Sequence, residues 1–327
     1  MTLKMDVDDD WENFCKGEYK IGDSNHEKVF ASPPTCGKLY VSTITKLAYL
    51  NSTIPLETIF WGIPVIYYES QQEGIIKKEM KFNSSTQEEL SHIQSKIPNG
   101  VFVHQHVLLH IDNKIGRIKF KDSRKISIGV CKKDILSTRA KKKGAFYNCF
   151  VIIMRLFDED TFKDIHVKIF NTGNVKIPGI KSDHMFERVI EKLVILLNDS
   201  VHFRNNPIKC LSDRTETALI NSNFNCGYFI NREKMYDILK IKYMLCCSYD
   251  PCSYPGIHIE YYYDITKMDD EQNGIKPSDI KNAIHMHIKV FRTGSCLILG
   301  KCSMSVIESI YKSLAIIFNN EHNNIIN

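Results

Sequence analysis

The chain lacks the features of a membrane protein, of a disulfide-stabilised secreted protein and of the common enzyme classes. Its 327 residues contain no apolar run close to 18 residues and no signal-peptide pattern, so we expect a soluble, intracellular protein. The eleven cysteines are an odd number without framework spacing, which favours reduced and mostly buried thiols. No nucleophile elbow, HExxH helix or paired-carboxylate signature is present, so we predict no enzymatic activity and no cofactor.

A metal site is not indicated either. A structural zinc site needs four ligands at suitable spacing, and the chain has no Cys-x2-Cys pair. The candidate ligands are three nearby cysteines and two pairs of histidines at alternate strand positions, which we interpret as core thiols and solvated imidazoles. These residues are Cys246, Cys247, Cys252, His104, His106, His285 and His287.

What the chain does contain is an internal repeat. Residues 166–182 read HVKIFNTGNVKIPGIKS, and residues 287–303 read HIKVFRTGSCLILGKCS, a shift of 287 − 166 = 121. Eight of the 17 positions are identical, against about one expected by chance from average composition. Two copies predict a pseudo-symmetric molecule and not a solenoid.

Each copy predicts a hairpin followed by a helix. An alternating strand leads into a turn with a Thr-Gly pair, and a return strand follows. Apolar residues at helical spacing come next, after Ser182 in the first copy and Ser303 in the second. The helical stripes are Met185, Val189, Leu193 and Leu196, and Val306, Ile310, Leu314 and Phe318. We expect each helix to cover one sheet face and to leave the other for water or a partner.

A second correspondence precedes the hairpins. Residues 41–60 and 217–239 both predict a strand and then a short helix, and Ile54 corresponds to Ile230 at a shift of 176. The shift exceeds 121 by 55 residues, so the first unit carries an insertion, which we assign to 65–145. Within it, 106–112 and 116–121 are predicted to be added strands.

Charge is unevenly distributed along the chain. The net charge is +5, but the first ten residues are acidic, and residues 1–37 are predicted to be a flexible tail. Residues 264–284 are predicted to form a polar loop. Residues 124–143 hold eight lysines and arginines, which form either a solvated loop or a set of phosphate contacts.

The second unit resembles the TATA-box-binding protein family. Residues 246–263 read CCSYDPCSYPGIHIEYYY, which resembles that family's Ser-Tyr-acidic-Pro…aromatic-Pro-Gly stirrup, and the HIKVFRTGSCLILG hairpin follows. VIIMRL with KIFNTGNVKIPG resembles the matching first-repeat strands, and VSTIT resembles the first strand. The resemblance covers about 41–63, 145–197 and 217–318. The long insertion resembles divergent members from large DNA viruses that replicate in the cytoplasm.

The resemblance implies an α+β fold. Two pseudo-symmetric repeats, 38–200 and 201–327, would share a saddle-shaped, curved antiparallel sheet with helices on its convex face. The concave face would bind the minor groove of A/T-rich double-stranded DNA and bend it with aromatic wedges, as minor-groove architectural proteins do. The implied function is that of a transcription initiation factor, a monomer that does not bind membranes.

The resemblance also implies roles for single residues. The wedges would be Phe170 and Phe291, which match the hairpin phenylalanines, with Tyr254 as the second wedge of its unit. For the first unit Phe146, Tyr147 and Phe150 are candidates, and we predict Phe150. The rest of the DNA-binding face would comprise Thr172, Thr293, Lys176, Leu297, Leu299, Lys46 and Arg155.

Several positions depart from the family pattern. Lys176 and Pro178 replace small β-branched residues, and Glu260 replaces the counterpart of Arg155, which puts strict TATA preference in doubt. The family's central asparagine pair has no clear match, although Asn221 and Asn223 are near. The stirrup, with Tyr249, Asp250 and Pro251, implies contacts with a transcription factor B-like protein and with RNA polymerase subunits.

Two other hypotheses remain open from the sequence. One is a protein-interaction scaffold that kept the fold and lost DNA binding. The other is an accessory, nuclease or glycosylase domain, which predicts an acidic or Lys/Asp site that we do not find. A viral protein of this kind would act in the host cytoplasm or the virion, and a cellular one in the nucleus.

Overall fold

The computed structural model describes residues 33–113, 115–136, 148–200 and 207–327. Those from Pro34 onward belong to one compact unit. No helix in these ranges has the length and apolar character needed to cross a membrane. The predicted tail falls almost entirely outside the described residues.

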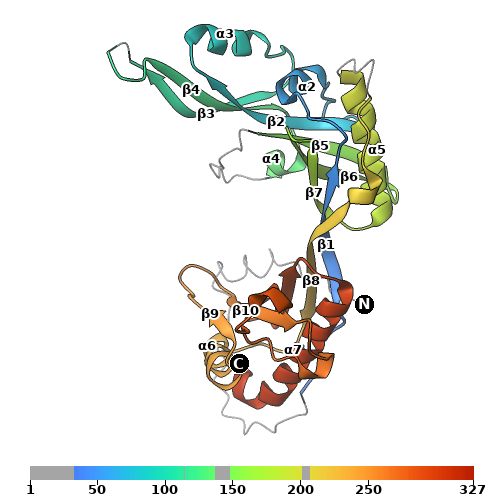
Figure 1. Cartoon of the computed structure of the whole chain (residues 1–327), viewed down its shortest axis with the longest axis vertical. Helices are drawn as coiled ribbons and strands as arrows, with labels where there is room; N and C mark the ends of the chain where they lie inside the picture. The colour runs from blue at the N-terminus through green and yellow to red at the C-terminus, as the bar shows by residue number, and fades with distance from the viewer. Residues whose placement is uncertain (1–32, 114, 137–147, 201–206) are drawn as a thin grey trace. The chain divides into compact units, whose positions relative to one another are not determined.

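The fold is α+β, as predicted, and its centre is one open antiparallel sheet of twelve strands (Figure 1). The sheet order is β3-β4-β2-β5-β6-β7-β1-β8-β12-β11-β10-β9. The strands are β1 (Tyr40–Tyr49), β2 (Gly74–Ser84), β3 (Val103–Asp112), β4 (Phe120–Gly129), β5 (Cys149–Asp158), β6 (Thr161–Phe170), β7 (Asn174–Ile180), β8 (Glu216–Asn225), β9 (Cys246–Ser248), β10 (Ile257–Asp264), β11 (Ala283–Val290) and β12 (Ser295–Gly300). The helices are α2 (Leu56–Gly62), α3 (Gln87–Ser95), α4 (Lys132–Leu136), α5 (Asp183–Ser200), α6 (Arg232–Asp237) and α7 (Met304–Ile325).

The strand order contains the repeat. From the β1–β8 pair outward, β7, β6, β5 and β2 on one side correspond to β12, β11, β10 and β9 on the other. The pair itself is antiparallel, with Ile44 opposite Ile220. Hydrophobic residues form a separate core cluster for each repeat.

Backbone hydrogen bonds recur at the two shifts that the sequence predicted. The Leu50 amide donates to the Gly173 carbonyl at 2.9 Å, and the Cys226 amide donates to the Gly294 carbonyl at 2.9 Å. Ile54 likewise donates to Asn171 at 2.9 Å, and Ile230 to Arg292 at 2.8 Å. Each opening segment is therefore bound to its own hairpin turn in the same way.

The hairpin turns share a conformation that requires glycine. Gly173 and Gly294 have φ of 86° and 79°, in the left-handed region that favours glycine. Each amide donates to the phenylalanine carbonyl three residues earlier, at 3.0 Å in both turns. A Cβ at Gly173 would lie 2.5 Å from the Ser52 carbonyl oxygen, and one at Gly294 would lie 2.4 Å from that of Tyr228.

The predicted helical stripes are confirmed in α5 and α7. Seven of the eight positions are buried; Leu196 is half-buried and its neighbour Leu197 is buried instead. The Ser182 hydroxyl accepts a hydrogen bond from the Met185 amide at 3.2 Å, as a helix cap does. Ser303 stands at the N-cap of α7 but makes no side-chain cap bond, and its hydroxyl lies 2.7 Å from that of Ser305.

The insertion extends one edge of the sheet. Strand β2, which the sequence analysis did not predict, pairs with β5 as β9 pairs with β10, so it belongs to the repeat. Strands β3 and β4 lie beyond it. The predicted strand at 106–112 lies within β3, but 116–119 lie outside any strand because β4 begins at Phe120. Residues 265–282 form the predicted polar loop, with two short 3-10 turns.

Candidate nucleic-acid interface

The sheet has two faces with different chemistry. The face toward α5 and α7 carries the two cores, and we call the opposite one the open face. In β11 and β12 alternation is regular: Ile288, Val290 and Ile298 are buried, whereas Lys289 and Leu297 are half-buried on the open face. Side chains of the open face are available to a ligand where no other segment covers them.

The open face of the second repeat ends in two aromatic rings. Tyr254 and Phe291 have centroids 6.0 Å apart at an interplanar angle of 58°. Tyr254 is 37% exposed, and Phe291 is half-buried. The Lys289 ammonium lies 4.6 Å from the Tyr254 ring centroid. The two predicted wedges of this repeat are thus adjacent and accessible.

In the first repeat Phe170 occupies the position of Phe291 and is also half-buried. The prediction for Phe150 is wrong. This side chain is 0% exposed in the first core, with its ring centroid 5.5 Å from that of Phe60. Its strand partner is Ile169, so it faces the helices.

The strand register identifies the position that corresponds to Tyr254. Phe150 lies opposite Ile169, and Ile257 lies opposite Val290, so Phe150 and Ile257 are equivalent. Three residues earlier in each repeat are Tyr147 and Tyr254. Tyr147, like the other candidate Phe146, lies outside the described residues.

Four side chains of the central strands meet on the open face. Leu297 is opposite Asn223, and Leu299 is opposite Asn221. All four are half-buried, and the Oδ1 atoms of Asn221 and Asn223 are buried without a hydrogen-bond partner among the described residues. Buried polar atoms are nearly always paired, so these two oxygens, which lack a hydrogen-bond donor, are unusual. In the sequence both asparagines are near the family's central pair, but spacing alone does not assign them to it.

The predicted threonines lie in the hairpin turns and not in the strands. Thr172 is exposed and Thr293 is half-buried. Both therefore border the open face at its hairpin end, next to Phe170 and Phe291.

Two lysines face each other on the open face of the first repeat. Lys176 on β7 is exposed and pairs directly with Lys168 on β6. Neither forms an ion pair with any residue that the structure describes. Like charges directly across a sheet are destabilising, and a bound anion would relieve the repulsion.

Lys46 does not lie on the open face, contrary to the prediction. A register irregularity between Ile44 and Lys46 changes the alternation of β1. The Lys46 ammonium consequently forms an ion pair with Asp183 at the start of α5, and it lies 4.9 Å from the Phe186 ring centroid. It therefore links β1 to a helix.

Arg155 is also not available to a phosphate. Its side chain belongs to the open face but is only 7% exposed as a residue. Its Nε lies 3.1 Å from an Asp164 carboxylate oxygen, and its guanidinium stacks 4.6 Å from the Tyr68 ring centroid and donates to the Tyr68 carbonyl. The segment after α2 thus covers Arg155, which sequence proximity could not show.

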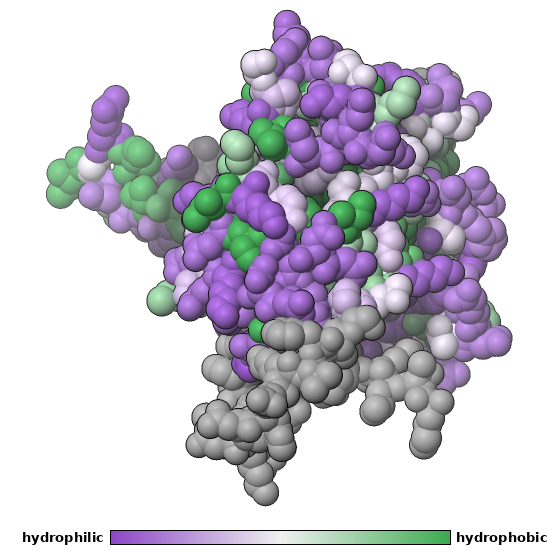
Figure 2. Space-filling view, turned by 90° about the horizontal axis from the view of Figure 1, so that it is seen from below, coloured by the Kyte–Doolittle hydropathy of each residue, from purple (hydrophilic) through white to green (hydrophobic). Residues whose placement is uncertain are grey.

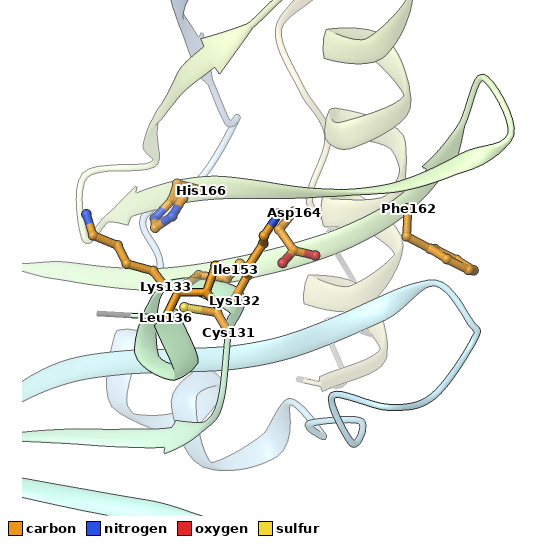
Figure 3. Close-up of a pocket in the computed structure, with 8 residues that line it drawn as sticks. All are labelled: Cys131, Lys132, Lys133, Leu136, Ile153, Phe162, Asp164 and His166. Carbon is orange, nitrogen blue, oxygen red and sulfur yellow. The ribbon is translucent and has the colours of Figure 1, made fainter. Parts of the chain in front are cut away.

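Helix α4 covers a further part of this face. Cys131, just before α4, packs on Ile153 and Ile76 in a small cluster separate from the main core. Asp134 of α4 accepts a hydrogen bond from Lys77 of β2 at 2.8 Å. Beside α4 is a hollow of about 650 Å³ (Figure 3). Its lining residues are Cys131, Lys132, Lys133, Leu136, Ile153, Phe162, Asp164 and His166.

The basic residues of the run 124–143 therefore have different environments. Arg124 is buried and paired with Asp122, and Lys125 pairs with Glu79 at 2.7 Å. Lys132 and Lys133 are exposed beside the hollow. The last four basic residues, from 139 to 143, lie outside the described residues.

The stirrup of the second repeat combines structural and exposed groups. Tyr249 is half-buried, with its ring 6.4 Å from that of Tyr236 on α6. Asp250 and Pro251 are exposed. Hydrogen bonds from the Ser253 hydroxyl and the Cys252 amide lower the pKa of Asp250 and keep the carboxylate charged. A charged, exposed turn results.

Histidines of the open face lie on two neighbouring strands, β10 and β11. His285 and His287 share one face of β11, and no group of three His, Cys, Asp or Glu side chains in the described ranges is arranged to hold a metal ion. The register adds His258 of β10, whose Nε2 lies 3.1 Å from Nδ1 of His287. This third histidine was missed because strand pairing is not visible in the sequence.

A comparison with a curated viral protein agrees with the resemblance. No family model matches the chain. The chain is 28% identical over 201 residues to a "TATA-box-binding protein-like" protein of Acanthamoeba polyphaga mimivirus, a match that covers 54% of this chain and spans about half (50%) of that relative. A solved structure of Methanococcus jannaschii TBP matches with a TM-score of 0.41 and 12% identity, over 85% of this chain and 96% of that one. The viral match confirms that this chain is similar to a divergent TATA-box-binding protein-like protein.

Proposed function

We propose that this protein is a transcription initiation factor that binds the minor groove of A·T-rich promoter DNA on its open face and bends it. The observation that carries the proposal is the pair of accessible rings, Tyr254 and Phe291, at the end of that face. Phe170 repeats the position of Phe291 in the first repeat. The name of the viral relative points in the same direction.

The rings supply the bending step. An apolar side chain inserted between two base pairs unstacks them at a cost of a few kcal/mol, and the bent duplex then contacts more protein. Tyr254 precedes Pro255 and Gly256 and is 37% exposed, and Phe170 and Phe291 are half-buried. A wedge at each repeat would kink the duplex at two steps.

The centre of the open face supplies the contacts with bases. The Nδ2 groups of Asn221 and Asn223 can donate to the A N3 and T O2 acceptors of the minor groove, whereas their Oδ1 atoms can only accept. Leu297 and Leu299 flank them and give an apolar surface that fits the groove floor. Because the minor groove distinguishes mainly A·T from G·C, we propose a composition preference and not a strict sequence.

Lysines supply the contact with the backbone. Lys168 and Lys176 face each other across β6 and β7, and a phosphate bound between them would reduce their mutual repulsion. The exposed Asp250 and Pro251 form a separate surface at the turn, which we propose as the contact for a transcription factor B-like protein and, through it, the polymerase.

The test uses short duplexes labelled at both ends, A·T-rich or G·C-rich. Anisotropy measures affinity, and energy transfer between the ends measures bending. We expect wild type to favour the A·T-rich duplex and to bend it, and Phe170→Ala/Phe291→Ala to lose the bend and at least tenfold in affinity. The control is Phe102→Ala, which removes an exposed phenylalanine (60%) outside the repeats.

The opposite result would favour the scaffold hypothesis. Equal binding of both duplexes, without a bend and unchanged in the double variant, would contradict the proposal. A scaffold would also be expected to expose a contiguous apolar patch. On the face shown in Figure 2, apolar residues occur in small groups between hydrophilic ones.

A further inference from the structure

Three histidines form a continuous array on the open face of the second repeat. Nε2 of His258 lies 3.1 Å from Nδ1 of His287, and their rings are stacked with centroids 5.3 Å apart. The ring of His285 lies 4.5 Å from that of His287 on one side. On its other side the His285 ring stacks on the Tyr262 ring, with centroids 4.6 Å apart and an interplanar angle of 6°. The array is therefore three imidazoles wide across β10 and β11.

The array is accessible. The His285 side chain is 39% exposed, and His258 and His287 are half-buried. The next positions on the same face are Lys289 along β11 and, across β12, Leu297 and Leu299. The array thus continues the row of side chains that includes Phe291 and the two asparagines.

When the three imidazoles are neutral, the charges of the neighbouring side chains sum to zero. Glu260 of β10 lies opposite His287, with its carboxylate 3.5 Å from Nε2 of His285, and Lys289 is the nearest cation. The neighbouring β9 contributes the Cys246 thiol, 3.9 Å from the same carboxylate. Neutral imidazoles leave the patch at −1 + 1 = 0, and each proton taken up adds one positive charge.

The His258–His287 contact limits how many protons the free protein holds. A hydrogen bond between two imidazoles needs one nitrogen to donate and the other to accept, so it is lost when both rings are charged. Burial, and then the neighbouring His285 and His258, lower the pKa of His287. The contact therefore opposes full protonation of the free array, and an anion placed against it would favour the charged form.

We propose that His258, His285 and His287 form a contact site for the DNA phosphodiester backbone. The site binds the backbone when its imidazoles are protonated. The proposal rests on the proposed function, since the ligand is the same duplex. Binding then takes up protons: the pKa of an imidazole in the complex is higher than in the free protein. Affinity consequently rises as pH falls through the pKa in the complex and levels off below the pKa of the free array.

The test measures affinity of the full chain for an A·T-rich duplex from pH 5.5 to 8.5 at constant ionic strength. We expect wild type to bind about tenfold more tightly per pH unit for each proton taken up. His258→Gln/His287→Gln should bind with nearly constant affinity, close to that of wild type at pH 8.5. Glu260→Gln should bind more tightly than wild type at pH 8. The matched control His92→Gln, an exposed histidine on α3, should keep the wild-type profile.

Two further measurements separate the array from other titrating groups. Calorimetry in buffers of different ionisation enthalpy counts the protons taken up, and only the double variant should lose them. The slope of log affinity against log salt should be steeper by about one at pH 6 than at pH 8 in wild type, because a protonated array adds about one phosphate contact. Circular dichroism confirms that the variants fold.

The outcomes distinguish this inference from the proposed function. A wild-type chain that bends the duplex with pH-independent affinity would overturn the array as a phosphate site and leave the proposed function intact. A pH profile that persists in the double variant would also overturn it. Absence of duplex binding at every pH would overturn both.

Discussion

The rings of Tyr254 and Phe291 approach each other over a glycine. A Cβ at Gly256 would lie 3.0 Å from Cε1 of Tyr254 and 3.0 Å from Cε1 of Phe291. The backbone at Gly256 therefore sets the distance between the two proposed wedges, whose centroids are 6.0 Å apart.

Substitution of Gly256 by alanine tests this geometry. The added methyl group should push both rings from their positions, so we expect DNA bending and affinity to fall, by at least fivefold in affinity. Stability should change little because both rings have accessible surface to move into. The control is Gly116→Ala in the β3–β4 turn, where the atoms nearest to the new Cβ belong to the Asn113 side chain. Unchanged bending by Gly256→Ala would argue against a fixed ring pair.

Arg155→Met separates a structural arginine from a phosphate contact. The structure pairs this buried guanidinium with Asp164 and backbone carbonyls, so we expect unfolding free energy to fall by about 1–3 kcal/mol in urea titrations. The matched variant Lys176→Met should not lower stability, since it removes one of two opposed like charges, and should weaken DNA binding, with a salt slope lower by about one. A stable Arg155→Met protein with a reduced salt slope would instead support the original phosphate assignment.

The two long helices allow a paired test of the repeat. Leu193 and Leu314 stand 121 residues apart, and both are 0% exposed. Alanine at either position should lower the unfolding free energy by about 2–5 kcal/mol, because a buried leucine is replaced by a cavity. Ile195 and Ile316 are the matching controls, 50% and 60% exposed, and should change it by about 0.5 kcal/mol. Equal effects at buried and exposed positions would contradict the packing described.

The environment of Lys78 leads us to expect that the free energy of unfolding rises with pH in mildly alkaline solution. Its ammonium donates at 2.5 Å to the carbonyls of Phe60 and Ile63 at the end of α2, and burial lowers its pKa to about 8 from 10.5. Between these pH values the unfolded chain holds more protons on this lysine than the folded one. The unfolding free energy should therefore rise with pH through this window, by at most about 1.4 kcal/mol per unit.

The measurement is a set of urea titrations from pH 7.5 to 10. Because other groups titrate in the same range, the informative quantity is the difference between wild type and Lys78→Met. The wild-type curve should rise relative to the variant as pH increases. Parallel curves would show that Lys78 keeps an ordinary pKa in the folded protein.

Local patterns predicted much of the fold. The doubled Phe-x-Thr-Gly hairpins, the helices that follow them and the opening strands all depend on neighbouring residues, and the structure confirms them. Strand β2 was missed because its sequence, GIIKKEMKFNS, places Lys77 and Lys78 on opposite faces, so it lacks a clean alternation. Both lysines are buried by long-range contacts with Asp134 and the end of α2.

The candidate site was less predictable because it depends on register. Phe150 is one position from the open face, and the irregularity before Lys46 turns that lysine toward α5. Arg155 lies on the expected face but is covered by Tyr68, 87 residues away in the chain. The contact between His258 and His287 likewise follows from strand pairing and not from spacing.

Helix α4 and Tyr68 cover part of the open face in the first repeat, so the two halves of that face differ. Two identical repeats would accept a duplex equally well in either orientation, because rotation about their pseudo-two-fold axis exchanges the halves. Here one half presents a lysine pair beside a covered region, and the other presents imidazoles and an aromatic pair. A duplex turned end for end would meet different chemistry at each end. If the open face binds DNA as we propose, the covered region of one half and the different side chains of the two halves would let it distinguish the two orientations of a duplex.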